Sequence, residues 1–394
     1  MAEKTLVIVI DALGYDLLNK ASLTSQLRSR AIKLVPSWGF GESAVMWSGQ
    51  PPQVTDRWNA FRLDQKGSPF RWTRHLPLSV FDLFRNSSFP LRLIEAVARK
   101  GVECLTMRRV RGTSPVTYHL PLAKLHFFSP VHDYEVYRHN SLNGHLTLFG
   151  LLRQKGVKCN YIGYPDIKTD REVFRRSLQA IQESEVTICF FFELDSIEHW
   201  QGKQSPEVSK KVDDLTEWIN KLTFLFKQQY PHGHIIIFSD HGMIDVREVL
   251  DVQSYLKGTG LKDGVDYLSF YDSTMVRFWF FSESSKKTIV DKLSRIEKGR
   301  ILRKDELKEG GLDFSGSYFG ELIFSADPGT IISPNYFQNK NLFQAVHGYC
   351  PPSPQEYGFF IADKDMVLGD ELRMESLFDI FLKIINVTFP KEDY

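Results

Sequence analysis

Short runs of consecutive apolar residues are the clearest pattern along the chain. Three of them stand out, TLVIVI (5–10), VTICFFFEL (186–194) and HIIIFS (234–239), and each contains few polar residues. Continuous apolar runs of this length are typical of strands that are buried on both faces, as in a parallel sheet. We therefore expect these three segments to be central strands of one such sheet.

Helical patterns lie between these runs, in GHLTLFGLLRQKG (144–156), REVFRRSLQAIQES (171–184) and SKKVDDLTEWINKLTFLFKQQ (209–229). Strands that alternate with helices indicate βαβ units. The predicted fold is a doubly wound α/β fold with a mainly parallel central sheet flanked by helices. Near the end of the chain, MESLFDIFLKIINV (374–387) reads as an amphipathic helix that packs on the core.

The pattern changes after about residue 245. The segment 267–281 reads as two strands of a hairpin, 285–299 as a helix and 321–334 as further strand. We expect a smaller α+β cap insert at about 250–330. Because 394 residues exceed the comfortable size of one simple core, we expect one large domain over 1–394 that contains this insert.

Composition narrows the class of protein. Hydrophobic residues at 42% and charged residues at 25% are ordinary for a soluble globular protein. A net charge of +1 implies no general attraction to a nucleic-acid duplex or to a membrane, and the basic cluster of Arg108, Arg109 and Arg111 reads as solvated surface. Four scattered cysteines form no disulfide framework, and no apolar run is long enough for a membrane span. We expect a cytoplasmic location; the oligomeric state stays open.

Side chains that can bind metal follow each of the three apolar runs. In open α/β sheets, ligands bind beyond the carboxyl ends of the strands, so these positions converge on one edge. A further histidine follows the insert, where the chain returns towards the sheet. The candidate residues are Asp11, Asp195, His199, Asp240, His241 and His347.

Each of these residues alone has an ordinary explanation. Asp11 fits a helix N-cap, His199 an ordinary polar histidine and His347 a turn residue. Together, however, three aspartates and three histidines at one edge are costly unless cations neutralise them. By contrast, His232 and His234 precede their strand, so they lie at the other edge and receive no role.

The types of side chain indicate which metal is held. Mixed imidazole and carboxylate ligands favour zinc, and manganese or iron less well. Six ligands are too many for one catalytic zinc, whereas two metals about 4 Å apart would share them and form a clamp for phosphoryl transfer. The sequence therefore predicts a two-metal site.

Four segments carry a resemblance to a known family. VIVIDALG, ELDSIEHWQG, FSDHGM and HGYCPPSP resemble the metal motifs of the alkaline phosphatase superfamily, and most closely its nucleotide pyrophosphatase/phosphodiesterase branch. The resemblance runs from residue 7 to about 385, and SGQPPQVTD is similar to a TG-containing segment of that family. It implies two zinc ions. One is held by Asp195, His199 and His347, and the other by Asp11, Asp240, His241 and the nucleophile.

The same resemblance implies a Thr or Ser nucleophile at the start of a helix that leads to Ser48 and Gly49. The expected position falls near Gly39, whereas Ser43 lies about one helical turn closer to Gly49. We predict Ser43 as the nucleophile and as a metal ligand. The alternatives are Ser37, a metal-bound water, or no chemistry at all. The resemblance also implies an asparagine just after the nucleophile, and this sequence has no counterpart to it. Glu42 would repel phosphate, so we expect its side chain to point away from the site.

The resemblance implies a two-zinc hydrolase of small-molecule phosphate esters, most naturally diesters or pyrophosphates, that acts through a covalent phosphoseryl intermediate. A phosphomonoesterase or phosphomutase of the same superfamily is the alternative within the class. A sulfatase is disfavoured because no C/S-x-P-x-R motif lies near Ser43. A different class of protein, a catalytically inactive metal-binding scaffold, also fits the altered segment around Ser43.

Overall fold

The computed structural model describes residues 3–19, 21, 30–84, 89–107, 119–131, 135–338, 341–364 and 366–387. The basic cluster of Arg108, Arg109 and Arg111 lies outside these described residues. Within them, none of the helices combines the length and the apolar character that crossing a membrane requires.

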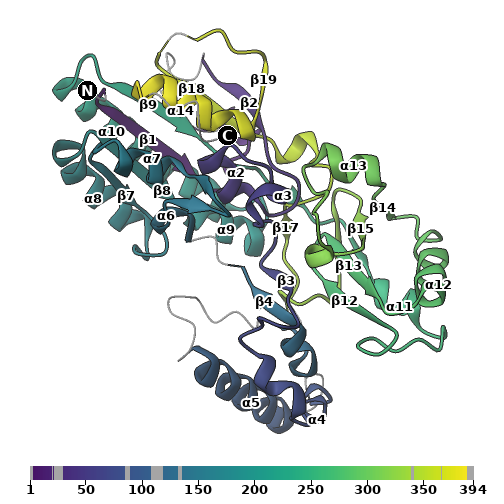
Figure 1. Cartoon of the computed structure of the whole chain (residues 1–394). Coiled ribbons are helices and arrows are strands. Elements are labelled where there is room, and N and C mark those ends of the chain that lie inside the picture. Colours follow the sequence, from purple (N-terminus) through teal and green to yellow (C-terminus); the bar gives the residue numbers. More distant parts are fainter. Residues whose placement is uncertain are drawn as a thin grey trace.

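A seven-stranded sheet in the order β19-β2-β18-β9-β1-β8-β7 forms the centre of the molecule (Figure 1). Strand β18 runs antiparallel to both of its neighbours, and the other pairings are parallel. The predicted doubly wound, mainly parallel α/β fold is therefore confirmed. The strands are β1 (Thr5–Ile10), β2 (Ile32–Val35), β7 (Cys159–Ile162), β8 (Val186–Phe191), β9 (His234–Phe238), β18 (Gly358–Ala362) and β19 (Glu371–Arg373).

Two helical layers explain why the central strands are continuously apolar. In β1, Val7 and Val9 belong to one hydrophobic cluster, which includes side chains of the first helical layer, while Leu6 and Ile8 belong to the cluster on the other face. Every residue of β1 is buried. The first layer contains α2 (Glu42–Ser48), α7 (Leu148–Gln154) and α14 (Leu377–Ile385), and the second contains α8 (Asp170–Glu183) and α10 (Pro206–Gln229).

Two of the predicted elements differ at their ends. The strand predicted over 186–194 stops at Phe191, because the chain turns at Phe192 and helix α9 (Glu193–Gln201) begins. Asp170 supports this turn by accepting the backbone N–H of Phe192 at 2.8 Å. The helix predicted over 144–156 is shorter, because β6 (His145–Leu146) pairs with β5 (Ser141–Leu142) before Thr147 caps α7.

A separate antiparallel sheet in the order β12-β13-β15-β14 lies beside the main sheet (Figure 1). We call this sheet and the elements packed on it the cap. Its strands are β12 (Tyr267–Tyr271), β13 (Met275–Phe280), β14 (Gly299–Ile301) and β15 (Leu322–Ala326). Around it lie β11 (Glu248–Leu250), β16 (Thr330–Ile332), α11 (Val252–Leu256), α12 (Glu283–Leu293) and α13 (Lys304–Glu309).

A second part of the chain shares the core of the cap, which the sequence pattern did not indicate. Strands β3 (Phe61–Leu63) and β4 (Phe128–Pro130) pair with each other, and Phe61 and Phe128 each pack against Phe270 of the cap, with ring centroids 5.4 and 5.2 Å away. The other α-helices and strands of the described chain are α3 (Pro52–Thr55), α4 (Ser79–Asp82), α5 (Phe89–Met107), α6 (Glu135–Arg138), β10 (Ile244–Asp245) and β17 (Ala345–Val346).

A buried arginine of the cap forms hydrogen bonds to the segment that contains β3. Arg277 is fully buried and donates to Asp272 at 3.0 Å, to the carbonyl of Phe61 at 2.8 Å and to Asn59 Oδ1 at 3.0 Å. Its guanidinium also lies 4.4 Å from the ring centroid of Phe270. The bonds to Phe61 and Asn59 cross between the two parts, and all three acceptors belong to buried residues, so this charge is satisfied within the core.

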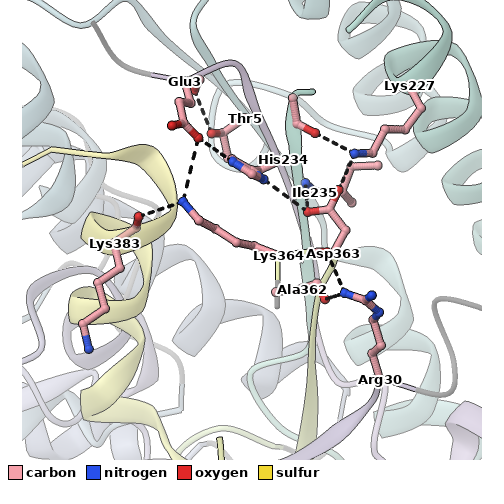
Figure 2. Close-up of polar contacts among 11 residues, drawn as sticks. Glu3, Thr5, Arg30, Lys227, His234, Ile235, Ala362, Asp363, Lys364 and Lys383 are labelled. Carbon is pink, nitrogen blue, oxygen red and sulfur yellow. Dashed lines mark hydrogen bonds and ion pairs between the residues drawn. The ribbon is translucent and has the colours of Figure 1, made fainter. Parts of the chain in front are cut away.

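The amino ends of the central strands carry a network of ion pairs, shown in Figure 2. His234 lies between Glu3, with Nε2 2.5 Å from Oε2, and Asp363, with Nδ1 3.6 Å from Oδ1. Lys227 pairs with Asp363 at 2.5 Å, and Lys364 lies 3.8 Å from Glu3. Arg30 donates to the backbone carbonyl of Asp363 at 2.6 Å. We call this group of residues the amino-edge cluster.

Candidate metal centre

All six predicted aspartate and histidine ligands lie at the carboxyl edge of the main sheet. Asp11 follows β1, and Asp240 and His241 follow β9. Helix α9 begins two residues after β8 ends, and it places Asp195 and His199 one turn apart. Because these strands are parallel neighbours, their carboxyl ends bring the three segments together.

His347 reaches the same edge through a short antiparallel pairing. Ile244 of β10, just after the SDHG segment, pairs with Val346 of β17, so His347 is delivered beside His241. The two imidazole rings are stacked, with centroids 3.8 Å apart and an angle of 8° between their planes. His347 also lies 5.4 Å from His199, between ring centroids.

Asp11, Asp240 and His241 form the first group of candidate ligands. One ligand atom from each lies within 4.8 Å of the others. His241 Nε2 is 3.3 Å from Asp11 Oδ1 and 3.9 Å from Asp240 Oδ1. Asp240 Oδ1 is held in place because it accepts the backbone N–H groups of Ala12 and of His241, at 3.3 and 2.9 Å.

Asp195, His241 and His347 form the second group by the same measure. Asp195 Oδ1 is 3.8 Å from His347 Nε2 and 3.5 Å from His199 Nε2. The resemblance implied His199 rather than His241 in this group. The structure places His199 next to Asp195, but the stacking of His241 on His347 makes His241 common to both groups.

Two of the imidazole rings have one nitrogen tied to the backbone. His199 Nδ1 lies 2.8 Å from the carbonyl oxygen of Ala345, and His241 Nδ1 lies 3.1 Å from that of Gly242. A carbonyl accepts only, so each Nδ1 carries the proton and donates. Each Nε2 therefore faces the carboxylates, and in the neutral ring it is the nitrogen whose lone pair can bind a metal.

Among the described residues, Asp11, Asp195 and Asp240 have no ion-pair partner other than histidine. Burial raises the pKa of Asp11, and the Asp240 and Asp195 carboxylates raise it further. Burial likewise raises the pKa of Asp240. Burial alone would lower the pKa of His241, but the Asp240 and Asp11 carboxylates outweigh it and raise this pKa well above its usual value. The pKa of His347 is lowered by burial and by its histidine neighbours.

Two buried atoms in the centre, Asp195 Oδ1 and His347 Nδ1, have no hydrogen-bond partner in the described part of the chain. Buried polar atoms without partners are rare and call for an explanation, such as an ion. The unpaired carboxylates and the histidine tautomers fit the same explanation. These residues therefore fit divalent cations, and the two overlapping groups fit two of them.

Ser43 is the second residue of α2, after Glu42, and it is half-buried. The helix ends at Ser48, where Gly49 adopts a φ of 67° and its N–H closes the last turn onto Val45. The preceding loop reaches the centre, because the Phe40 ring lies edge-on to His347, with centroids 5.4 Å apart. A short helix that starts near Ser43 and leads to Gly49 is therefore present, and the role of Ser43 stays a prediction.

Ser37 and Glu42, which lie near Ser43 in the sequence, are both buried. Ser37, the alternative nucleophile, is only 5% exposed, and its Oγ has no hydrogen-bond partner. The expectation that Glu42 points away from the site is not supported, because Glu42 is buried and its charge helps to raise the pKa of His241. The helix start is thus more closely packed against the centre than the sequence indicated.

Glu356 is a residue of this edge that sequence reasoning missed. Its carboxylate accepts the backbone N–H groups of Gly348, Tyr349 and Ser353 at 2.6, 3.1 and 2.8 Å, so it fixes the loop that follows His347. Burial raises the pKa of Glu356 to about 7. The segment SPQE has the S-x-x-E form of a capping box, and this signal could have identified Glu356.

Glu198 is a second missed residue, and nothing in the sequence singles it out. It is fully buried on α9, and neither carboxylate oxygen has a hydrogen-bond partner among the residues that the structure describes. Burial raises its pKa to about 8, so this group is largely neutral at pH 7 in the metal-free protein.

A doubly wound α/β sheet with two overlapping Asp/His groups at its carboxyl edge defines a class of proteins that can hold two metal ions. Within this class, the family model described as type I phosphodiesterase/nucleotide pyrophosphatase matches residues 5–350. The chain belongs to this family, and the resemblance found in the sequence is confirmed. The family is metal-dependent, and membership indicates a phosphodiesterase/pyrophosphatase enzyme.

Solved structures show the same fold. The chain is similar to human ectonucleotide pyrophosphatase/phosphodiesterase 5, with a TM-score of 0.65, 14% identity and coverage of 98% of this chain and 96% of that one. The murine protein of the same name matches with a TM-score of 0.64 at the same identity and coverage. Another murine structure, of an inactive threonine-to-alanine variant in complex with AMP, matches with a TM-score of 0.63, also at 14% identity over 98% and 96% of the two chains. At this level of identity the likeness concerns the fold alone.

Proposed function

We propose that the protein hydrolyses small-molecule phosphodiesters or pyrophosphates, with zinc as the metal and Ser43 as the nucleophile. The observation that carries this proposal is the pair of overlapping ligand groups that share His241 at the carboxyl edge of the sheet. The start of α2 lies nearby, because the loop before it contacts His347 through Phe40. Membership in the phosphodiesterase family supports the reaction class.

The donor set supports zinc over magnesium or calcium. Three imidazoles with three carboxylates are typical of zinc, and less typical of manganese or iron, whereas magnesium and calcium favour oxygen ligands. Bound cations would neutralise the charge of the phosphoryl oxygens and lower the pKa of the attacking hydroxyl. His241 has only Nε2 available and can bind one ion. Asp11, Asp240 and His241 would therefore hold one ion, and Asp195 and His347, with the neighbouring His199, would hold the other, as the family resemblance implies.

The proposed reaction has two steps. In the first, Ser43 Oγ loses its proton and attacks phosphorus, a bond forms between Oγ and phosphorus, the bond to the leaving oxygen breaks, and that oxygen leaves as an alcohol after taking up a proton. In the second, water attacks the same phosphorus, the bond to Oγ breaks, one proton of the water returns to Oγ, and a phosphate monoester leaves. The murine relative is inactive when a threonine is replaced by alanine and was solved with AMP, itself a phosphate monoester, which supports a hydroxyl nucleophile here.

The test compares a p-nitrophenyl phosphodiester with the monoester, on metal-stripped protein to which zinc, manganese or magnesium is added back. We expect zinc to restore hydrolysis, the diester to react faster, and Ser43→Ala to lower kcat about a thousandfold or more. Ser37→Ala is the matched control and should stay active. Faster hydrolysis of the monoester would favour a phosphomonoesterase or phosphomutase.

Two other results would overturn the proposal. A Ser43→Ala protein that keeps its activity would show that Ser43 is not the nucleophile. Absence of turnover although zinc is bound in stoichiometric amount would favour the inactive scaffold, so bound zinc is measured by mass spectrometry alongside hydrolysis.

A further inference from the structure

Helix α5 turns a row of apolar side chains to the surface of the molecule. Leu93, Ile94, Val97 and Leu105 are 54%, 46%, 65% and 53% exposed. Residues three, four or eight positions apart lie on one side of a helix, so these four share a side, which we call the α5 face. Contiguous exposed apolar side chains mark interaction sites in soluble proteins. Figure 1 shows α5, together with α4, in a part that projects beyond the main sheet and the cap.

The opposite side of α5 packs on the protein and is the more polar one. Glu95 and Thr106 are buried there, and Trp72 Nε1 donates to Thr106 Oγ1 at 3.2 Å. Arg99 donates to the Glu95 carboxylate at 2.9 Å and to the carbonyl of Leu120 at 2.8 Å. A helix that packs only on its own chain normally turns its apolar side inward. Helix α5 does the reverse, which indicates that its apolar side meets another surface.

The charge of this part indicates what kind of surface that is. Residues 61–130, from the start of β3 to the end of β4, contain twelve lysines and arginines but four aspartates and glutamates, a net charge of +8. The whole chain has a net charge of +1, from which we expected no attraction to a membrane, so the rest of it carries −7. Among the described residues of this part, the exposed lysines and arginines are Lys66, Arg71, Arg74 and Lys100.

The four carboxylates of residues 61–130 all have partners within the protein. Asp64 accepts a hydrogen bond from a serine hydroxyl at 2.9 Å, and Asp82 accepts one from a backbone N–H group at 2.7 Å. Glu95 and Glu103 form ion pairs on α5, and the side chain of each is only 12% exposed. The negative charges are therefore turned inward or paired, and a surface that complements this part is both apolar and anionic.

We propose that the α5 face binds the surface of a membrane that contains anionic lipids. Its apolar side chains enter the boundary between headgroups and acyl chains, and the exposed lysines and arginines contact the lipid phosphates. A second copy of the chain fits less well, because a symmetric dimer through this face would bring two strongly basic parts together. None of the candidate metal ligands belongs to residues 61–130, so this proposal is independent of the hydrolysis proposed above.

The experiment measures flotation of the full-length protein with two kinds of vesicle, one of equal parts phosphatidylcholine and phosphatidylglycerol and one of phosphatidylcholine alone. We expect binding to the anionic vesicles that weakens as salt is added, and binding to the neutral vesicles that is at least about tenfold weaker. Val97→Glu places a charge within the α5 face and should weaken binding to the anionic vesicles at least about tenfold. The matched control is Val265→Glu, between α11 and β12, because Val265 is 66% exposed and Val97 is 65% exposed. This control should bind like the unchanged protein.

A dye at Cys104 tests where the membrane contact lies. Cys104 is exposed, and it lies seven residues after Val97, on the same side of α5. An environment-sensitive dye attached to it should shift its emission to shorter wavelength when anionic vesicles are added. Cys104→Ser protein that is treated with the same dye should show no such shift.

Three results with vesicles would overturn the proposal. They are absence of binding to the anionic vesicles, equal binding to the neutral ones, and a Val97→Glu protein that binds like the unchanged one. A dimer in analytical ultracentrifugation that Val97→Glu dissociates would also overturn it, in favour of a second copy of the chain. Because no metal ligand is altered and no bond is broken, any of these results would leave the proposed hydrolysis untouched.

Discussion

Both edges of the main sheet carry histidines and carboxylates, but the two edges differ in what balances the negative charge. In the amino-edge cluster, Glu3 and Asp363 are paired with Lys227, Lys364 and His234 (Figure 2). At the carboxyl edge, three aspartates pack around histidines. There, no lysine or arginine of the described chain forms an ion pair with any of the three.

This difference separates a structural use of these residue types from a metal-binding one. At the amino edge the protein supplies its own cations, so an added ion would have little to neutralise. At the carboxyl edge the negative charge is not balanced. Burial and the Asp240 and Asp195 carboxylates raise the pKa of Asp11, so its carboxyl group tends to keep its proton. A divalent cation that replaces such protons is the simplest way to complete the balance.

The largest expected effect follows from neutralising Asp11. Asp11→Asn should lower diester hydrolysis with zinc by more than about a hundredfold, because the loss of residues that only orient metal ligands already costs that much. In the metal-free protein the same change should raise the Tm at pH 7, because burial disfavours the carboxylate there and Asp240 and Asp195 repel it. Activity, bound zinc and thermal unfolding are measured on the same preparation. A variant with full activity and full zinc content would remove Asp11 from the centre.

The matched change at the other edge should have the opposite signature. Asp363→Asn removes the charge that pairs with Lys227 but keeps the oxygen that accepts the backbone N–H of Ile235 at 2.9 Å. We expect a loss of about 1 kcal/mol of stability, because such pairs are partly exposed to solvent. Zinc content and hydrolysis should not change. A large loss of either would mean that the two edges are coupled and that the comparison is wrong.

Much of this arrangement was predictable because its signals are local. The apolar runs predicted β1, β8 and β9, and the residues that follow them predicted which side chains meet at the carboxyl edge. The family resemblance was confirmed by the match over residues 5–350. The nucleophile, the identity of the metal and the cytoplasmic location stay predictions.

The remaining features depend on contacts between distant parts of the chain. The packing of Phe61 and Phe128 on Phe270 joins segments that no periodicity relates, so the share of the cap core that comes from outside 250–330 was missed. The place of His241 in both ligand groups depends on the β10 and β17 pairing, which is too short to give a pattern. The capping-box signal at Glu356 was present, but its importance depends on the loop of His347 that it holds.

The smallest expected effect concerns Glu356, a carboxylate at the carboxyl edge that backbone N–H groups stabilise instead of cations. Its pKa in the folded protein is about 7, above the usual value of 4.5. A raised pKa means that its contribution to stability is fully present below about pH 4.5 and is lost as the pH rises through about 7. Glu356→Gln cannot ionise, so metal-free protein with this change should lose less Tm, by a few degrees, between pH 5 and pH 8.

The surface change Glu297→Gln is the control, because Glu297 is exposed and should leave the slope of Tm against pH unaltered. Asp11 and Asp240 contribute with the same sign in metal-free protein, since burial raises the pKa of each, so only the difference between the slopes of the variant and the unchanged protein isolates Glu356. Equal slopes would mean that the three N–H groups hold the carboxylate ionised throughout this range. In that case backbone N–H groups alone would stabilise the buried Glu356 carboxylate. The difference in charge balance between the carboxyl edge and the amino-edge cluster would then depend only on Asp11, Asp195 and Asp240.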